Sequence, residues 1–237
     1  MSFLILVRHG QSTWNLEKKF TGWVDVDLTE KGKSEAEKAG LLIRSENIKI
    51  DSYFSSFQLR AIHTLEIIQK VLNQKEDFIK AWQLNERHYG ALTGLNKIEM
   101  TKKIGENKVH EFRRSWDVKP EPLKKESPYH PLNIDTYKNI PRELIPSSES
   151  LKDTSERVIK FFDEKIREKL KKKNILISAH GNSIRALCKN LFGLDNNQIS
   201  ELEIPTGNPL KIEMDVDLKI MSCRYLDKER SKNLVIF

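Results

Sequence analysis

Residues 3–7 form an apolar run with no polar residue inside it. A run of this kind is typical of a strand that is buried on both faces of a sheet. Residues 174–178 form a second strand of this type, and residues 53–55 are a shorter candidate. The stretches 210–214 and 218–224 predict an antiparallel pair of strands.

Between these strands, apolar residues recur every three to four positions, as Leu65, Ile68 and Leu72 do. This is the spacing of one face of a helix. The segments expected to be helical are 29–45, 58–72, 151–170 and 182–191, and Ser150 with Asp153 resembles a capping box before the third of them. Strands that alternate with helices predict an α/β fold, with a mostly parallel central sheet and helices on both faces.

The middle of the chain breaks this alternation. Six of the eight prolines fall within residues 118–148, and proline removes a backbone donor and stops helices. Residues 97–116, just before, have a helical pattern. We therefore expect one domain, 1–237, that carries an inserted helical and loop subdomain at about 95–148. Long irregular segments inside compact domains usually have a function.

Composition excludes several classes of protein. The apolar runs are far shorter than the roughly 20 residues of a membrane-spanning helix, and the N-terminal segment lacks the basic region and cleavage site of a signal peptide. Two cysteines, Cys188 and Cys223, are too few for a disulfide scaffold or a Cys-rich zinc site. We expect no membrane association and a reducing, cytoplasmic location.

Charge leaves three kinds of partner open. The chain has 41 Lys and Arg against 34 Asp and Glu, a formal net charge of +7. Nucleic acid, an anionic lipid surface and a small phosphorylated substrate all fit this excess. The lysine pairs lie in separate segments, and the sequence has no RNP-like motif, zinc finger or basic zipper. Most of these lysines are therefore expected to form a solvated surface.

Two histidines stand in matching positions after expected strands. His9 and Gly10 follow the first strand, and His180 and Gly181 follow the strand at 174–178. In parallel sheets, ligands bind at the carboxyl edge. Glycine there permits close backbone approach, and the following helix N-terminus attracts anions. One such histidine is more often structural, but two in the same context predict a functional site.

Phosphoryl transfer suits these histidines better than metal binding does. The sequence has no H-x-x-x-H or H-E-x-x-H pattern, so we expect no metal. A neutral imidazole can attack phosphorus and carry the phosphoryl group. Arg8 adjoins His9, and Arg60 lies at a helix start, where the dipole disfavours a cation. Arginines so placed suit the binding of phosphoryl oxygens.

A series of motifs extends over nearly the whole chain and resembles one family. Residues 6–15 resemble the R-H-G signature of the histidine phosphatase superfamily, and their neighbours narrow the resemblance to the 2,3-bisphosphoglycerate-dependent phosphoglycerate mutases. The similar segments are, in order, 6–15, 20–23, 25–28, 60–64, 84–90, 95–97, 113–116, 148–151, 179–183 and 205–207. A series in the same order is far more specific than a single R-H-G.

The resemblance implies a role for each matching position. His9 would become phosphohistidine, His180 would stabilise the transferring phosphoryl group, and Glu86 would be the general acid and base. Arg8 and Arg60 would act with them on the phosphate. The substrate-binding residues would be Ser12, Asn15, Thr21, Gly22, Arg87, Tyr89, Lys97, Arg113, Arg114, Gly181 and Asn182.

The resemblance also implies a reaction and its partners. The enzyme would interconvert 3-phosphoglycerate and 2-phosphoglycerate in glycolysis and gluconeogenesis, with 2,3-bisphosphoglycerate as primer of phospho-His9 and no metal. Its partners would be these phosphorylated metabolites, not nucleic acid or a membrane, and it would form a homodimer or homotetramer. The insert would carry Lys97, Arg113 and Arg114 over the site and keep water from the phosphohistidine.

The sequence departs from the family in two places. Gln11 stands where the family usually has glutamate, which would alter the hydrogen bonding beside the nucleophile. Residues 233–237 replace a longer tail rich in lysine, alanine and glycine. We expect these mainly apolar residues to pack on the body, which would permit some phosphatase leakage. Ser12 resembles the mutases more than the bisphosphoglycerate synthase branch, which tends to have glycine there.

Two rival functions stay open. In a histidine phosphatase, water would take the phosphoryl group from His9, although compact phosphatases lack the long insert. Side activity as a bisphosphoglycerate synthase or phosphatase is grouped with this first rival function. A non-catalytic binder of anions or nucleic acid would need neither His9 nor Glu86.

Overall fold

The computed structural model describes residues 1–231, and the C-terminal residues 233–237, expected to pack on the body, lie outside this part. The strand expected at 3–7 forms β1 (Ser2–Arg8), which lies inside a six-stranded sheet of order β3-β2-β4-β1-β5-β6. The other strands are β2 (Ser52–Ser55), β3 (Phe78–Lys80), β4 (Ile175–Ala179), β5 (Leu210–Met214) and β6 (Ile220–Tyr225). Neighbouring strands among β3, β2, β4 and β1 pair in parallel, while β5 pairs antiparallel with β1 and β6. The predicted α/β fold class is confirmed.

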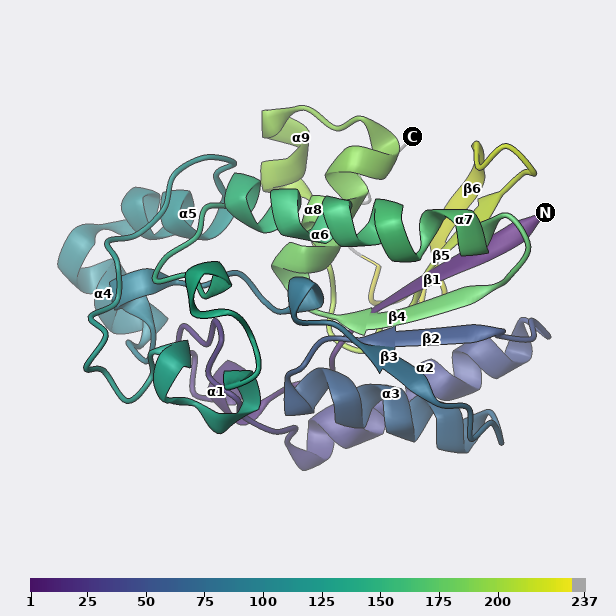
Figure 1. The fold of residues 1–237 in the computed structure, drawn as a ribbon, viewed down its shortest axis with the longest axis horizontal. Coiled ribbons are helices and arrows are strands. Elements are labelled where there is room, and N and C mark those ends of the chain that lie inside the picture. Colours follow the sequence, from purple (N-terminus) through teal and green to yellow (C-terminus); the bar gives the residue numbers. More distant parts are fainter. Residues whose placement is uncertain (232–237) are drawn as a thin grey trace.

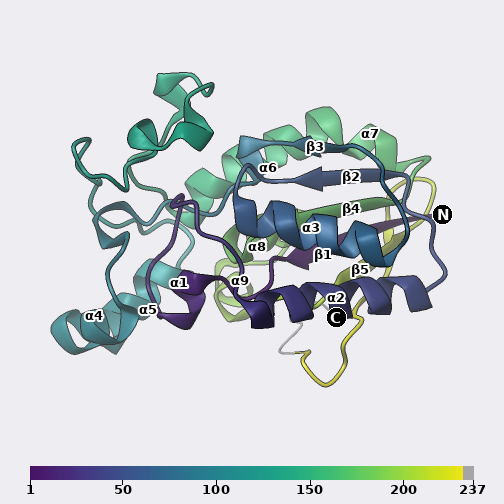
Figure 2. The same cartoon turned by 90° about the horizontal axis from the view of Figure 1, so that it is seen from below.

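The uninterrupted apolar run of β1 is explained by burial on both sides. Leu4 and Leu6 pack into one core cluster with α6 (Leu151–Lys165) and α8 (Gly181–Phe192). Ile5 and Val7 point to the opposite side and pack with α2 (Glu30–Ser45) and α3 (Leu59–Val71). Alternate residues of a strand face opposite sides, so a strand between two helical layers needs apolar residues at every position. Figures 1 and 2 show these two layers.

Two helices expected to be continuous are interrupted. The one at 151–170 is interrupted at Ile166, whose φ of −117° departs from the usual helical value of about −63°, and it continues as α7 (Arg167–Leu170). The one at 97–116 is split at Gly105, which has a φ of +86°, into α4 (Lys97–Ile104) and α5 (Glu106–Arg114). A positive φ is accessible to glycine at little cost, so Gly105 ends one helix and turns the chain into the next.

Short elements escaped the sequence prediction because they hold too few residues to show a period. They are β3, α1 (Thr13–Leu16), α9 (Asn196–Glu201) and the 3₁₀ turns η1 (Trp82–Leu84), η2 (Gly90–Leu92), η3 (Pro131–Asn133), η4 (Asp135–Tyr137) and η5 (Arg142–Leu144). The last three lie in the proline-rich stretch, whose expected irregularity is confirmed. Each of its three 3₁₀ turns has only three residues.

The segment at 95–148 lies beyond the carboxyl ends of the parallel strands, as Figures 1 and 2 show. Two small apolar clusters join it to the body. One contains Phe20 with Val109 of α5, and the other contains Trp23 with Tyr137 of η4. The loop that carries Phe20 and Trp23 is therefore fixed at both ends, together with Thr21 and Gly22 between them.

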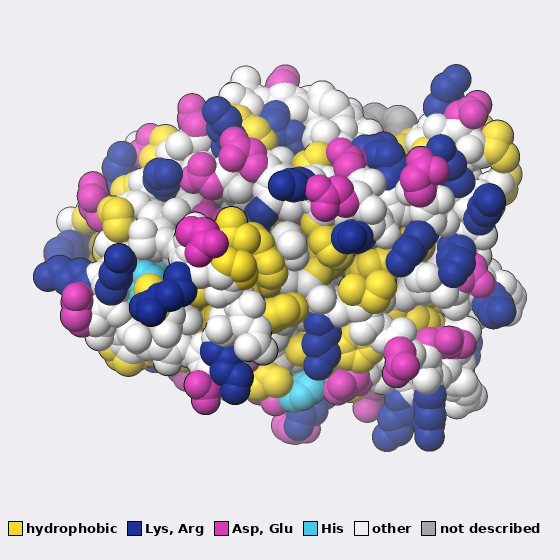
Figure 3. Space-filling view, in the orientation of Figure 1, with side chains coloured by type: hydrophobic (Ala, Val, Ile, Leu, Met, Phe, Trp, Pro, Cys, Tyr) yellow, Lys and Arg dark blue, Asp and Glu magenta, His cyan; other side chains and the backbone are white. Residues whose placement is uncertain are grey.

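Basic and acidic side chains are interspersed over the face drawn in Figure 3. This agrees with the expectation that most lysines form a solvated surface. No helix within residues 1–231 is long and apolar enough to cross a membrane.

Candidate active site

Parallel pairing of β1 and β4 brings the two predicted histidines together. Arg8 is aligned with Ala179 across the two strands, and the His9 backbone N–H donates to the Ala179 carbonyl at 3.0 Å. The next residues, His9 and His180, therefore leave the sheet side by side, with ring centroids 5.0 Å apart. Both side chains are buried.

The hydrogen bonding of His9 fixes which of its nitrogens is free. His9 Nδ1 lies 2.7 Å from the carbonyl oxygen of Gly10, which can only accept, so Nδ1 carries the hydrogen. Burial, together with the charges of Arg60 and Arg8, lowers the pKa of His9 well below 6.5. The imidazole is thus neutral at pH 7, and its Nε2 holds an unshared electron pair.

His180 is held differently. Its Nε2 is hydrogen-bonded to Ser56 Oγ at 2.8 Å, and its Nδ1 is buried with no protein partner among the described residues. Burial, and then the charge of Arg60, lowers the pKa of His180 well below 6.5. Its backbone N–H donates to Ser183 Oγ at 3.1 Å, which ties His180 to the first turn of α8.

Two arginines flank the histidines and are fixed by backbone carbonyls. Arg8 Nη1 donates to Ile204 O at 2.8 Å, and its Nε is buried without a protein partner in the described structure. Arg60, in the first turn of α3, donates to Gly22 O and Val24 O, both at 2.9 Å. Carbonyls satisfy part of each guanidinium without neutralising it, so the positive charge stays available for an anion.

Arg8, His9 and Arg60 open into one cavity, whereas His180 packs against His9 and does not line the cavity itself. The cavity is lined by Arg8, His9, Asn15, Thr21, Gly22, Arg60, Glu86, Tyr89, Lys97, Arg113, Arg114, Gly181, Asn182, Arg185, Glu203 and Ile204. Six of these residues are Lys or Arg and two are Glu. Such an excess of positive charge in a concave site suits a ligand with several negative charges.

Glu86 stands within this cationic lining. Its Oε1 accepts from the backbone N–H of Asn182 at 3.2 Å and from that of Arg87 at 2.8 Å. Asn182 Nδ2 in turn donates to the Tyr89 hydroxyl at 3.0 Å. Glu86 and Tyr89 from one loop are thereby tied to the N-terminus of α8, next to His180.

The insert contributes three cations. Lys97 Nζ donates to Lys19 O at 2.6 Å, and burial is the main cause that lowers its pKa to about 8. Arg114 pairs with Glu203 at 2.5 Å, while Arg113 lines the same cavity. Lys97, Arg113 and Arg114 thus bring three positive charges from the 95–148 segment to the cavity lining.

Two residues expected to bind substrate do not line the cavity. Ser12 is fully buried, and its Oγ caps α1 by accepting from the Asn15 backbone N–H at 3.2 Å. Arg87 is buried, donates to Phe112 O, and lies 4.8 Å from the centre of the Tyr89 ring. Each supports a residue that does line the cavity.

Gln11 acts away from the nucleophile. Its Oε1 accepts from Thr29 Oγ1 at 3.0 Å, and Thr29 is the N-cap of α2. The substitution of glutamine for glutamate is therefore accommodated at the start of α2, while His9 Nδ1 bonds to Gly10.

The sequence prediction missed three lining residues, Arg185, Glu203 and Ile204. Arg185 lies three residues after Asn182 on α8, so both share a helix face, and this spacing could have revealed it. Its Nη1 donates to Asn182 Oδ1 at 3.0 Å, and burial lowers its pKa to about 9. Glu203 and Ile204 lie in a loop, where no periodic signal exists.

No group of three or more His, Cys, Asp or Glu side chains that could hold a metal ion is present within residues 1–231. The cavity lining supplies a neutral nucleophilic imidazole, a carboxyl group and several fixed cations. Together these groups fit the transfer of a phosphoryl group through histidine.

A site of this kind is the hallmark of enzymes that use a histidine to carry phosphate. The family model "Histidine phosphatase superfamily (branch 1)" matches residues 4–221. Curated relatives from Pelagibacter ubique (66% identical, 100% of both chains) and Hydrogenobaculum sp. (49% identical, 99% of this chain and 96% of the relative) are both named 2,3-bisphosphoglycerate-dependent phosphoglycerate mutase. The chain therefore belongs to the histidine phosphatase superfamily and, within it, to the 2,3-bisphosphoglycerate-dependent phosphoglycerate mutase family.

Solved structures agree on the fold. YhfR of Bacillus stearothermophilus superposes with a TM-score of 0.69 at 21% identity, covering 93% of this chain and 94% of that one. A mycobacterial glucosyl-3-phosphoglycerate phosphatase also gives 0.69, at 19% identity, with coverages of 95% and 97%. At this identity the likeness concerns the fold alone.

Proposed function

We propose that this protein is a 2,3-bisphosphoglycerate-dependent phosphoglycerate mutase that interconverts 3-phosphoglycerate and 2-phosphoglycerate through phospho-His9. The observation that carries the proposal is a neutral His9 with a free Nε2 inside a cavity lined by six cations. The full-length likeness to relatives of that name supports the same reaction.

Phosphoryl transfer begins and ends at His9. Phospho-His9 transfers its phosphoryl group to the free hydroxyl of a monophosphoglycerate, so the phosphorus–nitrogen bond breaks as a phosphorus–oxygen bond forms. The resulting 2,3-bisphosphoglycerate re-orients, and Nε2 takes the other phosphoryl group. Arg8 and Arg60, which line the cavity, and His180, which packs against His9, would stabilise the charge of the phosphoryl group during its transfer.

Glu86 moves the proton in each half of the reaction. The attacking hydroxyl must lose its proton to Glu86 as it bonds to phosphorus. The alkoxide formed when His9 takes a phosphoryl group must regain that proton. Glu86 lines the cavity beside Asn182 and Tyr89, which supports this role.

The remaining cations hold the part of the substrate that does not react. Lys97, Arg113 and Arg114 lie on the insert and line the cavity opposite the strand ends. They would bind the carboxylate and the second phosphate, with 2,3-bisphosphoglycerate as primer of His9. Fixed cations supply the charge neutralisation that a metal provides in other phosphoryl-transfer enzymes.

The experiment is incubation of the protein with 3-phosphoglycerate and a trace of 2,3-bisphosphoglycerate, followed by phosphorus NMR. The proposal expects 2-phosphoglycerate to accumulate to a fixed ratio with 3-phosphoglycerate. Inorganic phosphate as the sole product would instead make the protein a phosphatase. No product at all would leave only an anion-binding role.

Phosphatase activity is the second candidate, and solved structures of this fold include enzymes named as phosphatases. Water must reach phospho-His9 for that reaction. The insert with Lys97, Arg113 and Arg114 covers the cavity and opposes it. Phosphatase or bisphosphoglycerate synthase turnover is accordingly expected only as a minor activity, visible as phosphate or 2,3-bisphosphoglycerate in the same spectra.

We further propose cytoplasmic location and assembly as a homodimer or homotetramer. Both follow from membership of a family of glycolytic enzymes. Sedimentation velocity of the purified protein tests the assembly.

A further inference from the structure

A buried ion pair lies directly behind the cavity. Arg157 Nε is 2.7 Å from Glu149 Oε1, and Arg157 Nη2 is 2.8 Å from Glu149 Oε2. The two side chains are only 9% and 5% exposed. Neither residue lines the cavity, so any effect on substrate must pass through other residues.

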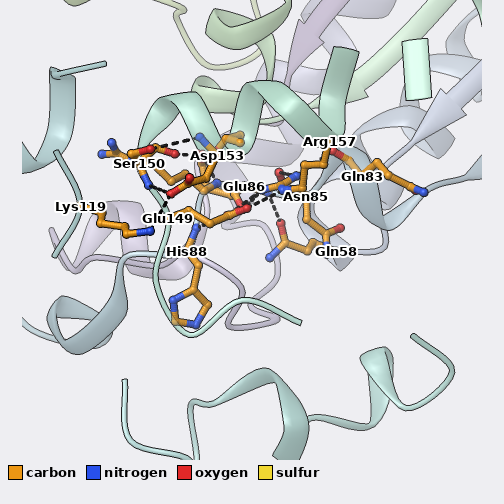
Figure 4. Close-up of polar contacts among 12 residues, drawn as sticks. Gln58, Gln83, Asn85, Glu86, His88, Lys119, Glu149, Ser150, Asp153 and Arg157 are labelled. Atoms are coloured by element: carbon orange, nitrogen blue, oxygen red, sulfur yellow. Dashed lines mark hydrogen bonds and ion pairs between the residues drawn. The ribbon is translucent and has the colours of Figure 1, made fainter. Parts of the chain in front are cut away.

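The pair is built on the rigid start of α6. Glu149 precedes the N-cap residue Ser150, and Arg157 lies two turns further along the helix. Ser150 and Asp153 form a reciprocal capping box, with hydrogen bonds of 3.1 and 2.9 Å. Lys119 adds an ion pair to Asp153 at 3.3 Å. The base from which Arg157 projects is therefore well fixed (Figure 4).

The remaining N–H groups of Arg157 donate to the short segment that runs from η1 to Glu86. Nη1 donates to Gln83 O at 2.7 Å and to Asn85 O at 2.9 Å, and Nη2 donates to Glu86 O at 3.0 Å. With the two bonds to Glu149, all five N–H groups of the guanidinium have acceptors. Three carbonyls that end at Glu86 thus converge on a single cation, as Figure 4 shows.

Glu149 holds the same loop from the other side. Its Oε2 accepts from the His88 backbone N–H at 2.8 Å, and its own N–H donates to His88 O at 2.9 Å. The Glu86 backbone N–H is itself bonded to Gln58 Oε1 at 3.0 Å. The peptide groups before, at and after Glu86 are therefore all fixed.

We infer that the Glu149–Arg157 pair is a positioning device for the Glu86 carboxyl group, an inference that rests on the proposed function. Stability alone is a weak reason for a buried ion pair, because desolvation of the two charges offsets much of their attraction. The bonds of this pair concentrate on residues 83–88, the loop that carries Glu86. A displacement of about 1 Å at a proton-transfer group can reduce the rate on the order of 100-fold.

The test is a double-mutant cycle in which Arg157→Lys keeps the charge but loses the fork of donors. We expect Arg157→Lys to lower kcat by roughly 10- to 100-fold with KM changed less than about threefold. In a Glu86→Gln background, where the proton-transfer group is already lost, the same change should lower kcat less than about twofold. An equal fold-loss in both backgrounds, or a rise in KM at constant kcat, would overturn the inference.

A matched control separates positioning from general loss of an ion pair. Lys211 and Glu46 form a largely buried pair at 2.7 Å, outside the cavity lining. We expect Lys211→Gln to lower the melting temperature but to leave kcat and KM within about twofold. If Arg157→Lys does not fold, Glu149→Gln takes its place in the same cycle, with the same expected and contrary results.

Failure of this inference is distinguishable from failure of the proposed function. Wild-type protein without mutase turnover would contradict the function. Active wild-type protein in which the losses from Arg157→Lys and Glu86→Gln multiply would contradict only the positioning role of the pair.

Discussion

The reactivity of His9 comes from its surroundings more than from its residue type. Nδ1 donates a hydrogen bond to Gly10 O, and burial beside Arg60 and Arg8 keeps the ring neutral. His180, 5.0 Å away, bonds Ser56 through Nε2 and keeps Nδ1 buried without a protein partner within the described residues. The different hydrogen-bond partners of His9 and His180 therefore leave different ring nitrogens without a protein partner in residues 1–231.

Replacement of the nucleophile should separate chemistry from binding. His9→Ala removes Nε2, so we expect no phosphoenzyme and no 2-phosphoglycerate, while 3-phosphoglycerate binding is kept by the cations. Phosphorus NMR of protein mixed with 2,3-bisphosphoglycerate measures the phosphohistidine signal. The exposed His110→Ala serves as control and should retain both signal and turnover. Full turnover by His9→Ala would contradict the mechanism.

Deprotonation of Lys97 should lower kcat/KM at alkaline pH. Its pKa is lowered to about 8, mainly by burial, so the ammonium group is charged below that pH and loses its proton above it. Attraction for an anionic substrate is present in the charged form only, and kcat/KM should therefore fall as pH rises through about 8. Lys97→Arg keeps its charge, so its pH–rate profile should stay flat to about pH 9. Identical profiles would assign this fall in kcat/KM to another group.

At the scale of elements, periodicity predicted the regular parts well and the interruptions poorly. The run of apolar residues at β1 and the spacing in α2 and α3 reflect local burial, which every residue of the element shares. The breaks at Ile166 and Gly105 depend on single dihedral angles. A glycine or isoleucine is compatible with either a straight or a broken helix, so tertiary contacts decide.

The cap of α6 is a local feature with a measurable effect. Ser150 Oγ accepts from the Asp153 backbone N–H at 3.1 Å. Ser150→Ala should lower the free energy of unfolding by about 1 kcal/mol, measured by urea denaturation. Ser45→Ala, on the exposed last turn of α2, should change it by less than about 0.5 kcal/mol. Equal effects would mean that the cap adds no stability.

At the scale of the whole molecule, the insert turns an open sheet edge into a cationic cavity. The loop containing Phe20 and Trp23 is packed against two parts of the insert. The 95–148 segment is therefore packed against the rest of the domain beside the cavity. Description of 1–237 as one domain with an insert at about 95–148 stays a prediction.

Because arginines and lysines supply the charge, turnover should not depend on a divalent cation. After dialysis against EDTA, we expect the rate of 2-phosphoglycerate formation to stay within about twofold of its initial value. Direct phosphorus NMR avoids coupling enzymes that need metal themselves. A large loss that Mg²⁺ or Mn²⁺ restores would show that a metal takes part.

The sequence by itself determined the elements and the chemistry at their ends. Burial on both faces required the apolar run of β1, and His9 and His180 each followed a strand whose carboxyl end faces the cavity. The motif series extended this to most of the cavity lining, because each motif is contiguous in the chain.

Only the tertiary structure decided which strand ends meet and what supports them. The order β2-β4-β1 placed His9 next to His180, and helix contacts placed Arg185 in the lining. Arg157 reaches Gln83 across 74 positions of sequence, a contact with no local pattern. Periodicity reports what each residue needs from its own element, whereas neighbours and protonation states arise from residues that folding brings together.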